Sequence, residues 1–459
     1  MERDKFSNVL NKLAERIEEK VIEKRDKKHI LLNRIDLEGF RKVIQEYVND
    51  RSLCKKTLNV DGRWRLDVAY GPQFEARLKT ERAGEIMVHT DETTLFGGSG
   101  TAIHPIQLCM AGFCGCFSAA FAKWTAMEGI KLNQLNIRTR ADLDISSTLG
   151  IQKDIPIVDD YEIELMVDSE SNLETLMNSL ELTKLRCFCS YCISNKIIPN
   201  FTLRKMTGEQ ATVDNKSNNT HTNKNQINGS ESYLNRVNLK AYKDTIEMYT
   251  ENPSLCKQVL EVEGRWRLDV EYGPQFEIKL QTEQAGEITV QTDETIILGG
   301  GGTSFHPVAL CITGFSASVL NEFANLASLK GIHLRELESQ AKMDIDLTSS
   351  FGIEDGIEMI DTFDVEILVD AEAPFDELNQ ILNDAIERSF CVYCYMTPIF
   401  PNVYITTEKA EKLAIAEKVA KPERKISLEE ELIHIDTLNI DSPCNLKHEI
   451  SRELKMSQL

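Results

Sequence analysis

Residues 105–127 read PIQLCMAGFCGCFSAAFAKWTAM, the longest apolar-looking stretch of the chain. The proline at position 105 suits the first turn of a helix, where its missing N–H leaves no hydrogen bond unmade. Apolar residues occupy nearly all positions rather than one stripe, as in a helix buried on most sides. Gln107 and Lys123 interrupt the run. The stretch therefore predicts a central core helix and not a membrane span.

The same helix occurs a second time, as PVALCITGFSASVLNEFANLASL at 307–329. Leu32 aligns with Leu234, and this offset of 202 residues (234 minus 32) holds without a gap to Asn200. The period is far longer than the roughly 20–50 residues of solenoid repeats. A whole domain has therefore been duplicated.

The composition limits the functions of the chain. It has 459 residues, 42% of them hydrophobic, which suffices for two or three domains with real cores. Acidic residues outnumber basic ones by 73 to 52, so the formal charge of −21 disfavours nucleic acid and anionic membranes as partners. The charged N-terminus resembles no leader, and the twelve cysteines indicate reduced thiols, metal ligands or redox chemistry. We expect a cytoplasmic protein.

The repeat predicts five segments. Its two domains span 32–205 and 233–406, joined by a linker at 206–232 that is rich in Asn, Thr, Ser and Lys. A charged helix at 1–31 and a charged tail at 407–459 lie outside the repeat and are interpreted as solvated segments or partner surfaces.

Within one copy, sequence periodicity predicts strands before and after the central helix. This order is typical of an α+β fold in which a curved sheet packs around a buried helix. We expect helices at 37–49, 105–127 and 172–187, and strands at 64–70, 73–80, 85–90, 134–146, 160–168 and 198–204.

The cysteines differ between the two copies. Cys114 and Cys116 correspond to Ser316 and Ser318, whereas matched cysteines at 54 and 256, and at 109 and 311, are interpreted as small buried hydrophobes. The remaining cysteines are 187, 189 and 192 in the first copy, 391 and 394 in the second, and 444 in the tail.

Three alternatives to thiol chemistry are weaker. Cys114-x-Cys116 with Cys189-x-x-Cys192 offers four zinc ligands. Residues i and i+2 of a helix point about 200° apart, so Cys114 and Cys116 cannot bind the same ion from one helix. The glycine loop GGSG at 97–100 lacks the Lys-Ser/Thr of a phosphate loop, so we interpret it as a tight turn. His104, like its counterpart His306, is interpreted as a capping or packing residue.

Redox chemistry requires a thiolate in a pocket, a group that lowers its pKa, and a second thiol to resolve its sulfenic acid. Cys116 lies about three turns into its helix, beyond the reach of the terminal dipole. A basic side chain must therefore activate it. Arg82 is favoured because its counterpart is Gln284, and the alternatives are Arg63, Arg65 and Arg77.

HPIQLCMAGFCGCF (104–117) resembles the helix motif of the OsmC/Ohr family of organic hydroperoxide reductases, and CSYC (189–192) resembles the motif of their second cysteine. The resemblance covers about 55–204 and 257–406. It implies that Cys116 attacks the peroxide and that Cys189 resolves the sulfenic acid. The chain departs from the family at Ile106 and Gln107, where a glutamate is usual, and at Ser190, where a proline is usual.

The resemblance also implies an architecture and a reaction. Two tandem OsmC-like domains, with curved antiparallel sheets around the buried helices, would form an intramolecular pseudo-dimer with one competent site. The reaction would be a thiol-dependent reduction of organic hydroperoxides, without metal or cofactor and with an external dithiol as reductant. Phe113, Phe117 and Trp124 would line the substrate pocket, with Cys192 and Cys114 as redox accessories.

Two other functions remain open from the sequence. A non-catalytic OsmC-like protein could bind a small ligand, or pass sulfur or disulfides through Cys189 and Cys192. A scaffold could recruit protein partners through its terminal helices.

Overall fold

The computed structural model describes residues 31–415 except 154, 207–209, 213–232 and 408–412. The helix expected before residue 31, most of the linker, the tail beyond 415 and Cys444 lie outside the described residues. Two short strands lie in the segments expected outside the two domains. Gln210–Thr212 forms β9 within the expected linker, and Leu413–Ile415 forms β18 within the expected tail.

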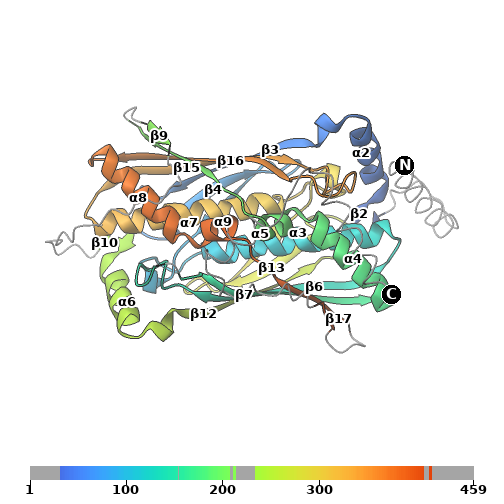
Figure 1. Cartoon of the computed structure of the whole chain (residues 1–459), viewed down its shortest axis with the longest axis horizontal. Helices are drawn as coiled ribbons and strands as arrows, with labels where there is room; N and C mark the ends of the chain where they lie inside the picture. Colours follow the sequence, from blue (N-terminus) through green and yellow to red (C-terminus); the bar gives the residue numbers. More distant parts are fainter. Residues whose placement is uncertain (1–30, 154, 207–209, 213–232, 408–412, 416–459) are drawn as a thin grey trace, which may run out of the picture. The chain divides into compact units, whose positions relative to one another are not determined.

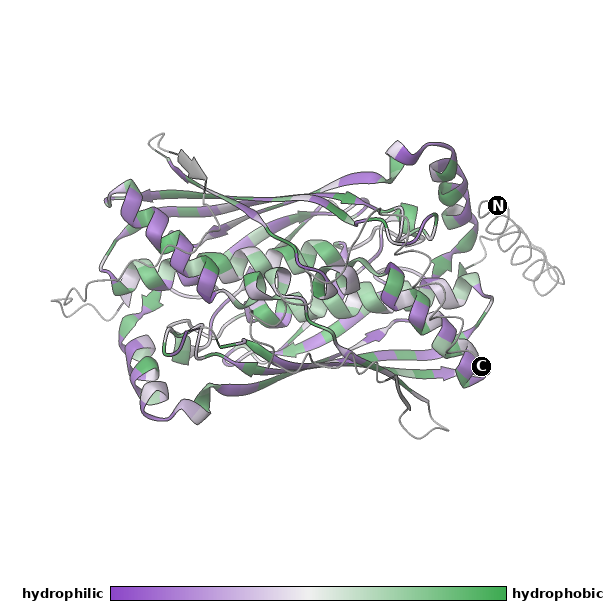
Figure 2. Ribbon diagram, in the orientation of Figure 1, coloured by the Kyte–Doolittle hydropathy of each residue, from purple (hydrophilic) through white to green (hydrophobic). Residues whose placement is uncertain are grey.

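The two long apolar stretches form the helices α3 (Pro105–Met127) and α7 (Pro307–Leu329), which lie side by side between two sheets (Figure 1). Each begins with a proline after a capping histidine. The Nδ1 atom of His104 accepts the N–H of Ile106 at 3.2 Å, which confirms the predicted capping role. Hydrophobic residues concentrate on these two helices (Figure 2). The predicted central core helix is therefore confirmed, and it has a partner.

By length and composition alone, α3 and α7 could each cross a membrane. Their most apolar windows are 83% and 94% buried within the protein. Such burial is typical of core helices.

Two seven-stranded sheets flank the helix layer. Their strand orders are β5-β4-β3-β15-β16-β8-β9 and β14-β13-β12-β6-β7-β17-β18. The strands of the first half are β3 (Lys55–Trp64), β4 (Phe74–Lys79), β5 (Glu85–Thr90), β6 (Leu132–Asp144), β7 (Val158–Ser169), β8 (Asn200–Lys205) and β9. Those of the second half are β12 (Lys257–Trp266), β13 (Phe276–Gln281), β14 (Glu287–Thr292), β15 (Leu334–Asp346), β16 (Ile360–Ala371), β17 (Asn402–Thr407) and β18.

Shorter elements cover the ends of the layers. The helices are α2 (Leu37–Asn49), α4 (Leu173–Arg186), α5 (Phe188–Ser194), α6 (Leu239–Glu251), α8 (Phe375–Arg388) and α9 (Phe390–Met396). Two-residue strand pairs, β1–β2 (Leu31–Leu32, Ile35–Asp36) and β10–β11 (Tyr233–Leu234, Val237–Asn238), precede α2 and α6.

Each sheet contains strands from both halves of the chain. The β6–β7 hairpin of the first half pairs with β12 of the second, in a register that runs from Asn136 opposite Arg265 to Asp144 opposite Lys257. The β15–β16 hairpin pairs in the same way with β3. A hairpin from each half thus completes the sheet of the other half.

The structure differs from the sequence prediction in two elements. The sheets are mixed rather than antiparallel, because β8 pairs in parallel with β16 and β17 with β7. The strand predicted at 64–70 is wrong, because β3 ends at Trp64 and the chain then turns back. In this turn the Arg65 N–H donates to the Gln73 carbonyl at 2.7 Å, and Gly71 has a φ of +96°.

The two long helices cross at a pair of glycines. A Cβ atom on Gly112 would lie 2.6 Å from the Cys311 Sγ and 2.6 Å from the Pro307 carbonyl oxygen. Gly314 has the same relation to Cys109 and Pro105, so the helices meet antiparallel. Backbone contact this close is possible only without a side chain.

The hairpin exchange predicts that neither half folds alone. Residues 30–205 without the second half leave unpaired edges on β3 and β6 and one uncovered face of α3, so this fragment should aggregate or self-associate. Adding residues 232–406 should rescue it. Size-exclusion chromatography and circular dichroism of the separate and mixed fragments measure this outcome.

The matched control is the intact chain with a protease site inserted in 213–232 and cut after folding, which should keep its secondary structure. A first half that is monomeric and unfolds cooperatively would contradict the prediction.

Candidate active site

Cys116 lies about three turns into α3 and faces the junction between α4 and α5. Its Sγ atom is 3.5 Å from the Sγ atom of Cys187. The Cys187 N–H donates to the Thr183 carbonyl at 2.8 Å, and the Cys187 carbonyl accepts the N–H of Tyr191 at 3.0 Å. Cys187 therefore ends one helix and begins the next, and this break brings its thiol to α3.

Two neighbouring thiols favour the ionised form of Cys116. Hydrogen bonds from the thiols of Cys187 and Cys189 lower the pKa of Cys116 well below its ordinary value, although burial and the Glu294 carboxylate oppose them. Burial and the bond to Cys116 raise the pKa of Cys187 well above its ordinary value, and bonds to Cys116 and Cys311 do the same for Cys189. Cys116 is thus the most acidic of these three thiols.

The second half has two serines at the positions of this thiol pair. The Ser318 Oγ lies 2.9 Å from the Ser389 Oγ, and these residues are the counterparts of Cys116 and Cys187 at the offset of 202. Both members of the pair differ between the copies. Sequence reasoning missed Cys187, although comparing position 187 with position 389 would have identified it.

The second half also contributes charged groups to the surroundings of Cys116. The His306 Nε2 lies 3.1 Å from the Glu294 Oε2, and both side chains are mostly buried. Burial opposes the charge on the imidazole, but the Glu294 carboxylate outweighs it and raises the pKa of His306, with a further contribution from the Cys116 thiolate. Against burial, His306 and then Lys123 lower the pKa of Glu294. The site of Cys116 therefore lies between the two halves.

Lys123 is a buried cation two turns after Cys116 on α3. Its Nζ lies 5.3 Å from the centre of the Phe40 ring, and its counterpart in the second half is Asn325. A buried lysine needs nearby negative charge. The Glu294 carboxylate provides it.

Arg82, predicted to activate Cys116, is not brought to it. The side chain is exposed, and the Arg82 N–H donates to the Gly302 carbonyl at 2.9 Å. The turn between β4 and β5 therefore contacts the glycine loop of the second half at Gly302, and it does not contact α3 near Cys116. Thiols and a backbone N–H, rather than a guanidinium, lower the pKa of Cys116. Of the alternatives, Arg63 and Arg65 pair with Glu75.

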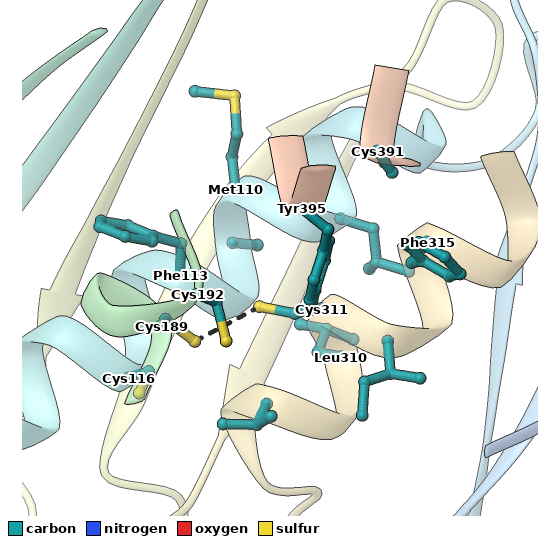
Figure 3. Close-up of a cluster of buried hydrophobic side chains, with 14 of the residues drawn as sticks. Met110, Phe113, Cys116, Cys189, Cys192, Leu310, Cys311, Phe315, Cys391 and Tyr395 are labelled. Atoms are coloured by element: carbon teal, nitrogen blue, oxygen red, sulfur yellow. Dashed lines mark hydrogen bonds between the residues drawn. The ribbon is translucent and has the colours of Figure 1, made fainter. Parts of the chain in front are cut away.

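A row of thiols continues from Cys116 into the second half. The Sγ atoms of Cys189 and Cys311 are 3.7 Å apart (Figure 3). Those of Cys109 and Cys391 are 3.2 Å apart. Between these pairs, the Cys109 thiol donates to the Cys311 carbonyl at 3.3 Å, and the Cys311 thiol donates to the Cys109 carbonyl at 3.4 Å. Cys391, for which the sequence suggested no role, lies at the far end of this row.

An apolar cavity of about 80 Å³ lies beside the row. Of the residues predicted to line a substrate pocket, Phe113 lines this cavity, whereas Phe117 and Trp124 do not. Phe117 stacks behind Phe113 at 5.7 Å, and Trp124 packs under the Arg186 guanidinium at 4.3 Å. The other residues that line the cavity include Met110, Cys189, Cys192, Ile193, Phe390 and Tyr395.

Cys114 points away from this site. Its Sγ lies 3.4 Å from the Thr139 Oγ1, and burial raises the pKa of Cys114 to about 12. The half-turn between positions 114 and 116 separates the two thiols, so Cys114 cannot be an accessory to Cys116. Within the described part of the chain, no group of three or more His, Cys, Asp or Glu side chains could hold a metal ion.

Comparison with known proteins identifies a family for part of the first half. A family model described as OsmC-like protein matches residues 98–201, which include α3, Cys116 and the α4–α5 junction. No curated protein matches the chain.

The thiol geometry predicts selective alkylation of Cys116. Its pKa is lowered, so its reaction with iodoacetamide should already have reached a plateau at neutral pH, where Cys187 and Cys189 remain protonated. Cys187→Ala removes one donor to the thiolate and should move the pH curve of Cys116 alkylation about one to two pH units higher. Peptide mass spectrometry across pH measures this.

The control is Cys192→Ala, which removes another α5 thiol and should leave the curve in place. An unchanged curve in Cys187→Ala would contradict this account of the pKa.

Proposed function

The chain carries an OsmC-like domain at residues 98–201, and from this premise we propose that it is a thiol-dependent peroxidase that reduces organic hydroperoxides at Cys116. One observation carries the proposal. The Cys116 thiol has a lowered pKa and lies 3.5 Å from the second thiol that peroxide chemistry requires.

The proposed reaction balances with these groups alone. The Cys116 thiolate attacks the terminal oxygen of the hydroperoxide, the O–O bond breaks, and the alkoxide leaves and takes a proton to become an alcohol. Cys116 is now a sulfenic acid. A second cysteine attacks its sulfur, hydroxide leaves as water after protonation, and a disulfide forms. An external dithiol then reduces the disulfide by exchange.

The apolar cavity supports an organic hydroperoxide as substrate. Its walls include Met110, Phe113 and Ile193, and it is bounded by Cys189, which hydrogen bonds to Cys116. If the apolar tail of the hydroperoxide occupied this cavity, only the Cys189 side chain would separate it from Cys116. Burying such a tail gains roughly 25 cal/mol per Å² of apolar surface, which hydrogen peroxide cannot provide.

In our proposal Cys187, and not Cys189 as the sequence suggested, attacks the sulfenic acid of Cys116. The Cys187 Sγ lies 3.5 Å from the Cys116 Sγ, and both residues are replaced by serine in the second half, at Ser389 and Ser318. If Cys116 and Cys187 take part in one reaction, a copy without that reaction is expected to lack both cysteines, as the second half does. Cys189, whose thiol also contacts Cys311, would then accept the disulfide by exchange.

We interpret the two halves as an intramolecular pseudo-dimer of OsmC-like units with one competent site. The sequence repeat, the exchange of hairpins between sheets, and the contribution of Glu294 and His306 to the surroundings of Cys116 support this interpretation. The second half would then supply part of the site without a reactive thiol of its own.

The proposed reaction uses no bound cofactor or metal and takes its electrons from an external thiol or dithiol. All eleven cysteines in the described residues are free, which suits a reducing compartment such as the cytoplasm. Neither nucleic acid nor membrane has a role in the proposed reaction.

Steady-state turnover tests the proposal. The wild type should reduce cumene hydroperoxide with a dithiol, and Cys116→Ser should lower the rate by roughly 10³-fold or more, because a serine hydroxyl cannot replace the thiolate. Ser318→Ala in the second half is the matched control and should keep the wild-type rate. Turnover in Cys116→Ser equal to that of the wild type would exclude the proposed nucleophile.

The resolving thiol can be identified by mass spectrometry after one equivalent of peroxide. In the wild type we expect a disulfide that includes Cys116, and in Cys187→Ser an accumulation of Cys116 sulfenic and sulfinic acid. Cys192→Ser is the control and should form the disulfide normally. A Cys189–Cys192 disulfide with Cys116 untouched would instead support a disulfide-transfer protein.

A further inference from the structure

At the positions that correspond to the thiol site of the first half, α7 borders a partly open, mostly apolar cavity that residues of both halves line. The cavity has a volume of about 270 Å³. One wall is a face of α7 formed by Ser318, Asn321, Glu322 and Asn325, and the opposite wall is the start of α3 near His104. Glu92, from the loop after β5, also lines it.

The α7 wall differs in chemistry from the matching face of α3. At the offset of 202, Ala119 corresponds to Asn321, Ala120 to Glu322, and Lys123 to Asn325. The spacing of 318, 321, 322 and 325 places these side chains on one helix face. Two small apolar groups and a cation are therefore replaced by two amides and a carboxyl group.

Three polar atoms on this wall are unpaired. The Oδ1 atoms of Asn321 and Asn325 and the Oε2 atom of Glu322 have no hydrogen-bond partner within the part of the chain that the structure describes. Asn321, Asn325 and Glu322 are only 5%, 1% and 6% exposed. A buried polar atom without a partner costs about 1–3 kcal/mol. Three such atoms beside one cavity therefore indicate a ligand that satisfies them.

The charges around the cavity indicate the nature of that ligand. Glu92 is already engaged, because it pairs with the His104 Nε2 at 2.9 Å and accepts from the Asn321 Nδ2 at 3.0 Å. Glu322 has no such partner. Burial raises the pKa of Glu322 to about 8, against the effect of Arg388 and with a further increase from Glu92. A cation beside Glu322 would favour the carboxylate, which can then accept hydrogen bonds.

We propose that this cavity binds a small organic cation with N–H donors, an amine or guanidinium compound with a short carbon chain. Amide and carboxylate oxygens of Asn321, Asn325 and Glu322 accept its hydrogen bonds. Leu143, Ile145 and Leu149 provide an apolar wall for its carbon chain. The volume is below that of cavities for drug-sized ligands, so the ligand is smaller. The site contains no thiol and is independent of the proposed peroxidase reaction.

Isothermal titration of the full chain with n-butylguanidinium tests the proposal, with n-butylurea as an uncharged analogue of similar shape. We expect saturable binding of n-butylguanidinium with a Kd of about 1 mM or tighter, and binding of n-butylurea at least about tenfold weaker. No saturation by n-butylguanidinium, or equal affinity for the two probes, would overturn the proposal.

Variants locate the binding in the second half. Glu322→Gln keeps the size of the side chain and should weaken n-butylguanidinium binding at least about tenfold. Asn325→Lys introduces the residue of the first half and should abolish binding by repulsion. Circular dichroism establishes that both variants are folded, and the wild type should show a rise in Tm with ligand that a misfolded variant cannot mimic.

Cys116→Ser is the control for the thiol site and should bind n-butylguanidinium as the wild type does. Loss of binding in Cys116→Ser, with normal binding in Glu322→Gln, would place the ligand in the other half and refute the assignment.

Discussion

The close crossing of α3 and α7 is the contact on which the rest of the structure depends. Gly112 and Gly314 allow the two backbones to meet, and the thiols of Cys109 and Cys311 each donate to the carbonyl of the other residue. Because the helices cross antiparallel, each helix start lies beside the middle of the other helix. The start of α7 thereby brings His306, and with it Glu294, toward Cys116. Any side chain at the crossing would separate the backbones and disturb both sites together.

This crossing explains why the second half has the same frame although serines occupy the positions of Cys116 and Cys187. Ser318 and Ser389 hydrogen bond at 2.9 Å, so the α7–α9 contact persists without sulfur. The groups that the second half contributes to Cys116 lie on the β14–α7 loop and at the start of α7, away from these serines. The hairpin β15–β16 likewise remains necessary, because it fills the gap between β3 and β8. The second half can therefore have different residues at its own site and still supply the residues that surround Cys116.

The sequence predicted those features that depend on local pattern or on the repeat. The helix at 105–127 follows from its apolar run. Cys116 was selected by its difference with Ser318 together with the resemblance of its helix to the OsmC/Ohr motif, and its role stays a prediction. The strand at 55–64 was missed because its charged residues alternate with few apolar ones, and it gains its stability by pairing with β15 of the other half. Cys187 was missed because its role depends on the break between α4 and α5. Arg82 was chosen because its counterpart is Gln284, but a difference between the copies does not show whether a side chain points toward Cys116 or toward solvent.

The two halves also show how one backbone can support two kinds of chemistry. The face of α3 that carries Cys116 and Lys123 holds a thiolate, a cation and the Glu294–His306 pair, so opposite charges are balanced within it. The matching face of α7 carries Asn321, Glu322 and Asn325 near the Glu92–His104 pair, and it has Asn325 where α3 has Lys123. The carboxyl–imidazole pair is the same in both places, and the helix face alone differs. The unpaired acceptor oxygens on the second face are the physical reason why we assign it a positively charged ligand, whereas the first face has Lys123.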